Sequence, residues 1–206
     1  MIRRIVLSSG NKHKISEIKD ILKDMPFEVV SKDDLGYKEF EVEEDGETLE
    51  ENAFKKAKEL HKLVKEIVIA DDTGLFVDAL NGEPGVYSAR YAGEAASYDD
   101  NNKLLLSKLK DVSLEKRTAY FKTVIAIIFK DGSKMTAEGT VYGKIDFQER
   151  GQNGFGYDPL FIVEDTGKTF AEMNDEDKNK ISHRARALMN LKEKLEDSGE
   201  NISNQR

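Results

Sequence analysis

The chain has 206 residues, with 32 basic and 40 acidic side chains and a formal net charge of −8. This negative balance argues against a nonspecific binder of nucleic acid or of a membrane surface. The sequence contains no cysteine, which excludes disulfides, thiolate-bound zinc and a thiol nucleophile, and fits a cytoplasmic protein. No stretch approaches the roughly 20 apolar residues of a membrane span, so we expect a soluble protein.

The chain opens with a strand, a tight turn and a helix. Ile2–Ser8 is apolar and predicts a strand, and Ser-Gly-Asn-Lys at residues 9–12 predicts a turn into a helix over about Lys14–Lys23. Backbone amides at such a turn and the positive end of the helix dipole can bind a phosphate, together with a hydroxyl, an amide and two lysines. The alternative is a capped helix start with solvated lysines, which the spacing alone favours.

A second strand is predicted at Phe27–Ser31, followed by the acidic segment Glu39–Glu47, which is either solvated or cation-binding. The next helix runs from Thr48, its candidate cap, to about Lys65 and has apolar residues at helical spacing. Lys56 lies four residues after Asn52 on one helix face, where it either reaches a phosphate or faces solvent.

Residues 68–73 read as a buried strand that ends in two adjacent acids, Asp71 and Asp72, just before Gly74. Charges at such a strand end lie at the edge where open α/β sheets bind ligands. These acids and the acidic run at residues 43–45 offer hard oxygen ligands suited to Mg²⁺. A turn-forming aspartate and a solvated acidic face are the alternatives. Alternation along an extended chain predicts that only one acid of the pair faces a metal.

Strands, turns and helices alternate in the rest of the chain. The predicted segments are an extended Leu75–Leu80, a turn at Asn81–Gly85, a helix at Tyr98–Lys110, strands at Arg117–Lys130 and Met135–Tyr142 joined by an Asp131-Gly132 hairpin, a loop at Gly151–Gly156, a strand at Leu160–Val163 and a last helix from Ile181 to Leu195 with Ser182 as cap. The tail from Asp197 is polar. The pattern indicates a mixed α/β fold without internal repeats or a domain boundary.

Two later groups could bind a base. Gly-Phe-Gly-Tyr-Asp-Pro at residues 154–159 places aromatic rings in a glycine-flanked loop, where a ring offers a stacking platform or fills a core. Lys178, Ser182, His183 and Arg184 combine hydrogen-bond donors near a helix start, as either a base-reading cluster or surface ion-pair elements.

Taken together, six motifs resemble, in order along the chain, the inosine triphosphate pyrophosphatase family. They are Ser-Gly-Asn-x-x-Lys at 9–14, Glu-Asn-Ala at 51–53 after the acidic patch, Ala-Asp-Asp-Thr-Gly-Leu at 70–75, Gly-x-Pro-Gly-Val-Tyr-Ser-Ala-Arg-Tyr at 82–91, Phe-Gly-Tyr-Asp-Pro at 155–159 and Ser-His-Arg at 182–184. The likeness extends from Ile5 to about Leu195. Ser9 and Thr73 stand where many members have Thr and Ser, and both keep the hydroxyl.

The resemblance implies an elongated, two-lobed α/β domain over residues 1–196, with a curved mixed β-sheet flanked by helices and an active cleft between the lobes. It also implies a homodimer. The implied activity is Mg²⁺-dependent hydrolysis of the non-standard purine nucleoside triphosphates ITP, dITP and XTP to the monophosphate and pyrophosphate, which removes them from the nucleotide pool.

The resemblance also implies a role for each matching residue. The implied triphosphate contacts are Ser9, Asn11, Lys14, Lys56 and the backbone of Gly10, and the implied metal ligands are Glu43 and Asp72. Asp72 is also the implied water-activating residue, and Thr73 would contact substrate beside it. The implied base-binding loop is Phe155, Gly156, Tyr157 and Asp158, with Lys178, His183 and Arg184 at the base edge.

Hydrogen bonding gives this assignment a physical basis. Hypoxanthine and xanthine carry a 6-keto acceptor where adenine carries a 6-amino donor, so cationic donors such as His183 and Arg184 favour the keto bases. A buried donor without a partner costs roughly 1 to 3 kcal/mol, enough for about tenfold to a hundredfold discrimination. Two alternatives to this predicted function are a regulatory module that binds nucleotides without turnover and a related pyrophosphatase with another base preference, such as modified pyrimidines.

Overall fold

The computed structural model describes residues 3–23 and 27–197, and the chain divides into two compact units. The first unit contains the residues up to Asp72, Thr123–Gly139 and the residues from Arg184 onward. The second unit contains Thr73–Lys122 and Thr140–His183. The predicted start of the first strand at Ile2 and residues 198–206 of the predicted tail lie outside the described residues. No helix in the described ranges is long and apolar enough to cross a membrane.

The strands form a mixed sheet with the order β2-β1-β3-β5-β6-β7, and β4 pairs with β3. They are β1 Arg3–Leu7, β2 Phe27–Ser31, β3 Ile67–Val77, β4 Pro84–Gly85, β5 Thr118–Ile128, β6 Lys134–Ile145 and β7 Phe161–Val163. The helices are α1 Lys12–Leu22, α2 Leu49–Val64, α3 Tyr98–Lys108, α4 Asp175–Ile181 and α5 His183–Asp197. β1 pairs in parallel with β2 and β3, whereas the pairs β3–β4 and β6–β7 are antiparallel. The predicted α/β class with a mixed sheet is confirmed.

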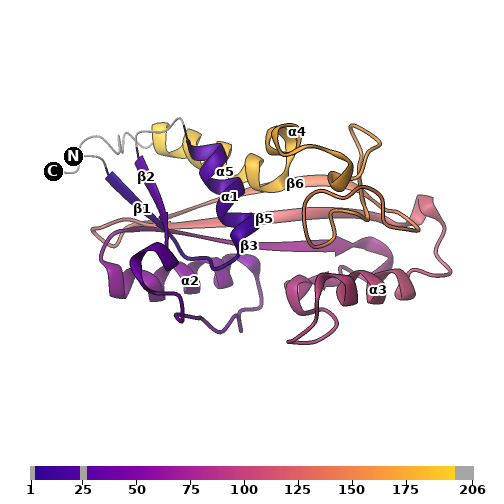
Figure 1. Ribbon diagram of the computed structural model, residues 1–206, viewed down its shortest axis with the longest axis horizontal. Helices are drawn as coiled ribbons and strands as arrows, with labels where there is room; N and C mark the ends of the chain where they lie inside the picture. The colour runs from indigo at the N-terminus through magenta and orange to yellow at the C-terminus, as the bar shows by residue number, and fades with distance from the viewer. Residues whose placement is uncertain (1–2, 24–26, 198–206) are drawn as a thin grey trace. The chain divides into compact units, whose positions relative to one another are not determined.

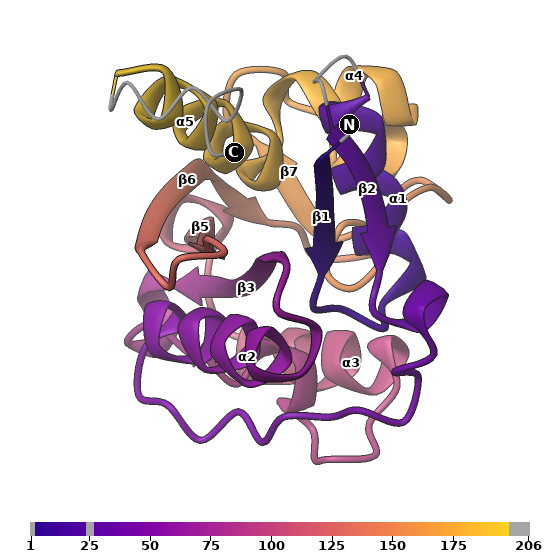
Figure 2. The ribbon, with the colours of Figure 1, turned by 90° about the vertical axis from the view of Figure 1, so that its left-hand side faces the viewer.

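In the first unit, alternate residues of the central strands face different helices. Figures 1 and 2 show α1 and α5 on one side of β1 and β3, and α2 on the other side. The core on the α1 and α5 side contains Ile5, Leu7, Ile67, Ile69, Ile18, Leu188 and Leu191. Side chains alternate along a strand, so the even-numbered neighbours of these strand residues face α2.

The start of α2 confirms the prediction of a helix capped by Thr48. The Thr48 hydroxyl accepts a hydrogen bond from the Glu51 amide, and the Glu51 carboxylate accepts one from the Thr48 amide. Behind this cap, the helix buries an apolar stripe that consists of Leu49, Ala53, Ala57 and Leu60. The helix that carries Lys56 is therefore fixed at its start and along one face.

In the second unit, the core contains a group of packed aromatic rings among aliphatic side chains. The rings of Phe121 and Phe161 have centroids 4.8 Å apart, and those of Phe161 and Phe170 have centroids 5.5 Å apart. The last helix predicted from Ile181 to Leu195 with Ser182 as its cap is confirmed as α5, which begins at His183, directly after Ser182. The short helix α4 before it was not predicted. Ser182 has extended backbone angles (φ −64°, ψ 156°), which end α4 and separate it from α5.

The prediction that Asp71 and Asp72 end a strand at the sheet edge is also wrong. β3 runs through both acids to Val77 and lies between β1 and β5 in the sheet. Gly74 is not a turn residue but a point of close approach, because a Cβ there would lie 2.6 Å from the Gly85 carbonyl oxygen in β4. Glycine therefore serves the strand pairing at this position.

We expect Gly74→Ala to destabilise the protein by about 1–3 kcal/mol, because the added methyl overlaps the β4 backbone and cannot be accommodated by a side-chain movement. Urea unfolding followed by circular dichroism measures the change. Ser107→Ala on the exposed face of α3 is the control and should shift the free energy of unfolding by less than about 0.5 kcal/mol. Equal stability of the two variants would contradict the close approach.

Candidate active site

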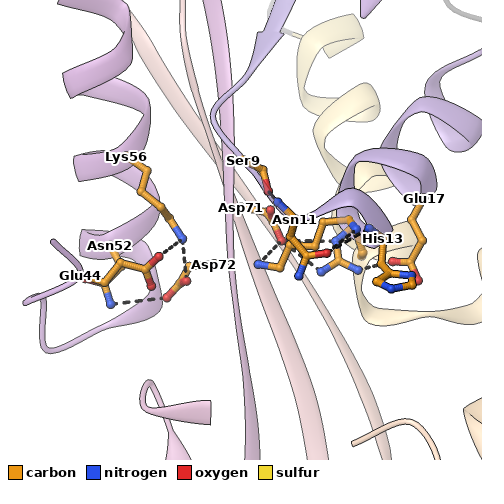
Figure 3. Close-up of polar contacts among 11 residues, drawn as sticks. Ser9, Asn11, His13, Glu17, Glu44, Asn52, Lys56, Asp71 and Asp72 are labelled. Carbon is orange, nitrogen blue, oxygen red and sulfur yellow. Dashed lines mark hydrogen bonds and ion pairs between the residues drawn. The ribbon is translucent and has the colours of Figure 1, made fainter. Parts of the chain in front are cut away.

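Asp71 and Asp72 are neighbours in β3 whose side chains point to opposite faces of the strand, as alternation predicts (Figure 3). Asp72 contacts Lys56 of α2, whereas Asp71 contacts Lys14 of α1. Both residues are almost fully buried, with exposed fractions of 4% and 3%. The two acids therefore belong to two polar groups on opposite faces of one strand.

On the α2 face, Lys56 bridges two carboxylates. Its Nζ lies 2.8 Å from Asp72 Oδ1 and 3.0 Å from Glu44 Oε1. Asn52 Nδ2 lies 3.5 Å from the other Asp72 oxygen. Burial and the negative charge of Glu44 raise the pKa of Asp72 above its ordinary value, although Lys56 acts in the opposite direction. A carboxylate with a raised pKa accepts a proton more readily, which is the property that a general base needs.

Glu44, rather than Glu43, lies beside Lys56 and Asp72. The residues of this acidic segment alternate between exposed and half-buried, which leaves Glu43 exposed and turns Glu44 inward. Asn52 holds the segment in place, because its Oδ1 accepts a 2.8 Å hydrogen bond from the Gly46 amide. The choice between adjacent acids depends on this tertiary contact and has no signal in the sequence.

On the α1 and α5 face, Asp71 is surrounded by cations. Its Oδ2 lies 3.1 Å from Lys14 Nζ and 3.1 Å from Arg184 Nη2. Arg184 also forms an ion pair with Glu17. Burial alone would raise the pKa of Asp71, but the two cations outweigh it and hold the pKa well below its usual range. Asp71 is therefore a charged partner within the strand and not a turn-forming aspartate.

The turn before α1 is a capped helix start. Asn11 Oδ1 accepts hydrogen bonds from the amides of His13 and Lys14, and Ser9 Oγ accepts one from the Asn11 amide. Asn11 and Ser9 thus order the turn itself, and the same turn carries Lys14 to the Asp71 group.

The aromatic loop of the second unit is organised around Asp158. Asp158 Oδ2 accepts a 2.8 Å hydrogen bond from the Phe155 amide and a 2.7 Å hydrogen bond from Lys178 Nζ. Lys178 Nζ also lies 4.8 Å from the centroid of the half-buried Phe155 ring. A Cβ at Gly154 would lie 2.2 Å from Asp158 Oδ2, so the loop requires glycine there. Phe155 and Lys178 are thereby held side by side.

Tyr157 and His183 pack into the core of the second unit. The Tyr157 hydroxyl donates a 2.9 Å hydrogen bond to the Ser88 carbonyl oxygen. The His183 ring stacks on Phe121 at a centroid distance of 4.6 Å. Tyr157 therefore fills the core, as one of the two alternatives predicted. Of the two aromatic rings in the loop, Phe155 remains the candidate stacking platform for a base.

The predicted cluster of Lys178, His183 and Arg184 is divided among different neighbours. Lys178 pairs with Asp158, His183 packs on Phe121, and Arg184 pairs with Asp71. Consecutive helical residues project about 100° apart, so His183 and Arg184 at the start of α5 point in different directions. The shared role in reading the base edge, which the resemblance implied, stays a prediction.

A model of the Ham1 family matches residues 5–194. The chain belongs to the Ham1 family. A dITP/XTP pyrophosphatase from Thermoanaerobacter sp. (strain X514) is 56% identical over 189 residues, which cover 92% of this chain and 94% of the relative. A dITP/XTP pyrophosphatase from Bacillus subtilis (strain 168) is 46% identical over 196 residues, which cover 95% and 98%.

Solved structures agree with this membership of the Ham1 family. The Ham1 protein of Staphylococcus aureus aligns with a TM-score of 0.83 and 44% identity over 95% of this chain and 100% of that chain. A HAM1 protein from Coxiella burnetii aligns with a TM-score of 0.85 and 36% identity over the same shares. The family and the enzyme class predicted from the six motifs are confirmed.

Three residues with polar contacts in this member of the Ham1 family were not singled out from the sequence. Glu17 follows Lys14 by three residues, and that spacing on a helix could have indicated a shared face. Glu44 is hidden in an acidic run. Asn102 of α3 donates 2.8 Å and 3.2 Å hydrogen bonds to the Glu149 carboxylate and the Gly156 carbonyl oxygen, a contact across 54 residues without a sequence signal.

The α2 face has a donor set that fits a divalent cation. Within residues 3–23 and 27–197, no three His, Cys, Asp or Glu side chains form a metal-binding group. Asp72 and Glu44 both contact Lys56 and supply hard carboxylate oxygens. Mg²⁺ typically takes only one or two protein carboxylates and completes its shell with water and phosphate oxygens. Two carboxylates are therefore sufficient for this ion.

Proposed function

We propose that this chain hydrolyses ITP, dITP and XTP to the corresponding monophosphates and pyrophosphate, with Asp72 as the general base. The main support is the buried group on the α2 face, in which Lys56 joins Asp72 to Glu44. A buried carboxylate with a raised pKa beside a fixed ammonium is suited to water activation next to a negatively charged substrate. The relatives named dITP/XTP pyrophosphatases support the substrate class.

In the proposed reaction, Asp72 takes a proton from the attacking water. The water oxygen forms a bond to the α-phosphorus, and the bond from that phosphorus to the bridging oxygen breaks. Pyrophosphate leaves with the electron pair, and the proton ends on Asp72 before release to solvent. Burial lowers the pKa of Lys56, but Asp72 and Glu44 raise it by more, so Lys56 stays protonated. Its positive charge offsets negative charge beside the reacting groups.

Asp72 and Glu44 would hold Mg²⁺, which would supply charge neutralisation for the phosphate oxygens. The resemblance favours Glu43 as the second ligand, whereas the contacts with Lys56 favour Glu44. Glu43→Gln and Glu44→Gln form a matched pair that decides between them. The variant that needs a higher Mg²⁺ concentration for half-maximal activity lacks the ligand, and we expect it to be Glu44→Gln.

The turn before α1 and the α2 face are proposed to bind the triphosphate. Ser9, Asn11, Lys14 and Lys56 provide polar groups for its oxygens, and Gly10 leaves room for close backbone approach. Lys14 is oriented by its ion pair with Asp71.

Residues of the second unit are proposed to bind the base. Phe155 stacks on it, the backbone of Gly156 frames it, and Asp158 fixes Lys178 as a donor for the 6-keto group. Tyr157 and His183 support this loop from the core. Thr73 is proposed to contact substrate beside Asp72, and Arg184 to act through Asp71.

A panel of ITP, dITP, XTP, GTP, ATP and modified pyrimidine triphosphates, ranked by kcat/KM with Mg²⁺, tests the proposed function. We expect the three keto purines ITP, dITP and XTP to rank first and pyrophosphate to be the primary product. Orthophosphate as the primary product would indicate a phosphatase, and binding without turnover would indicate a regulatory module. The predicted homodimer and cytoplasmic location stay predictions.

A further inference from the structure

Lys32, directly after β2, is a buried lysine outside the groups described above. Its exposed fraction is 7%, and lysine is almost never buried to this extent without a compensating arrangement. The backbone is fixed as well, because the Lys32 amide donates a 2.9 Å hydrogen bond to the Leu7 carbonyl oxygen at the end of β1. The position of its ammonium group is therefore determined by the fold.

Three acceptors surround this ammonium group. Lys32 Nζ donates to Asp33 Oδ1 at 3.0 Å, to the Tyr37 carbonyl oxygen at 3.1 Å and to the Lys38 carbonyl oxygen at 2.9 Å. These contacts match the three hydrogens of an ammonium group. The two carbonyls belong to the chain that leads into the acidic segment with Glu44, so Lys32 fixes the start of that segment.

The same ammonium group lies beside the turn before α1. A Cβ at Gly10 would lie 3.7 Å from Lys32 Nζ and 3.8 Å from its Cε. Only one of the three acceptors, Asp33, carries a negative charge, and its side chain is 34% exposed. A positive charge that is only partly screened therefore lies against the turn proposed to bind phosphates.

We propose that Lys32 is a positioning residue for triphosphate binding, which orders the start of the acidic segment and places a fixed positive charge behind Gly10. The inference rests on the proposed function, because it assigns the turn of Ser9, Gly10 and Asn11 to the triphosphate. Lys32 acts without a direct contact to substrate, since its three hydrogens are used within the protein.

Calorimetric titration with inorganic tripolyphosphate in metal-free buffer tests this role with a probe that has no base. We expect Lys32→Met to weaken tripolyphosphate binding about tenfold, because the fixed charge is lost. Lys32→Arg keeps the charge and should remain within about threefold of wild type. Lys38→Met removes an exposed lysine six residues away, keeps the carbonyl that Lys32 contacts, and should bind like wild type.

The variant Asp33→Asn distinguishes an effect of the positive charge of Lys32 from a purely structural role of Lys32. Asparagine retains the Oδ1 acceptor for Lys32 and removes only the negative charge, so we expect tripolyphosphate to bind about two- to threefold more tightly. Weaker binding by Asp33→Asn, or equal binding by Lys32→Met and wild type, would overturn the inference. Asp33→Asn decides the question even if Lys32→Met does not fold.

Measurements on the wild-type protein distinguish a failure of this inference about Lys32 from a failure of the proposed function. Wild type that neither hydrolyses ITP nor binds tripolyphosphate would overturn both. Wild type that does both, with charge variants that all bind equally, would overturn only the role of Lys32.

Discussion

Asp72→Asn is expected to lower kcat for ITP by about 10²–10⁴-fold, the contribution typical of a general base, while the protein stays folded. Folding should persist because Lys56 keeps its ion pair with Glu44 when Asp72 becomes neutral. Steady-state release of pyrophosphate measures kcat, and thermal unfolding checks the fold. Asp99→Asn, on the exposed surface of α3, is the matched control and should retain wild-type activity.

The pH profile gives an independent test of the same residue. Asp72 must be deprotonated to accept a proton, so kcat/KM of the wild type should fall as the pH decreases through the Asp72 pKa. An ordinary aspartate has a pKa of about 3.9. Burial and Glu44 raise the pKa of Asp72 above this value, so the fall in kcat/KM should begin at a higher pH than for an ordinary aspartate. If Asp72→Asn retains both near-wild-type kcat and the acidic limb, another residue is the base.

Asp71→Ala is expected to lower the free energy of unfolding by roughly 3–5 kcal/mol, because it leaves buried cations without their common partner. Arg184 is 1% exposed and would keep only Glu17 of its two acidic neighbours, and Lys14 would lose its ion pair. Denaturant unfolding at pH 7 measures the loss. The double variant Asp71→Ala/Arg184→Met should be more stable than Asp71→Ala, since it also removes the buried charge.

The contribution of Asp71 should also depend on pH in a defined direction. Its folded-state pKa lies well below the unfolded value, so the stabilisation is fully present above the unfolded value of about 3.9. It is lost as the pH falls toward the folded-state pKa. The stability difference between wild type and Asp71→Asn should therefore shrink below about pH 4, and a constant difference from pH 7 to pH 2 would show that the charge of Asp71 is not the cause.

Local chemistry allowed much of the fold to be predicted. The strand, turn and helix at the start depend on an apolar run, an Asn cap and an apolar helix face, all within about 20 residues. The Thr48 cap is equally local, because Thr48 and Glu51 satisfy each other's amides. By contrast, the role of Gly74 could not be predicted from its neighbours in sequence, because it depends on close approach of the distant strand β4.

The sequence by itself determined the family, the strand that carries Asp71 and Asp72, and the divergence of their side chains, because alternation is a property of the backbone. Only the tertiary structure decided which helix each acid meets. It placed Lys56 at Asp72, and Lys14 and Arg184 at Asp71. It also turned Glu44 inward and brought Lys32 behind Gly10. These choices depend on burial and charge pairing between distant segments, which no local pattern records.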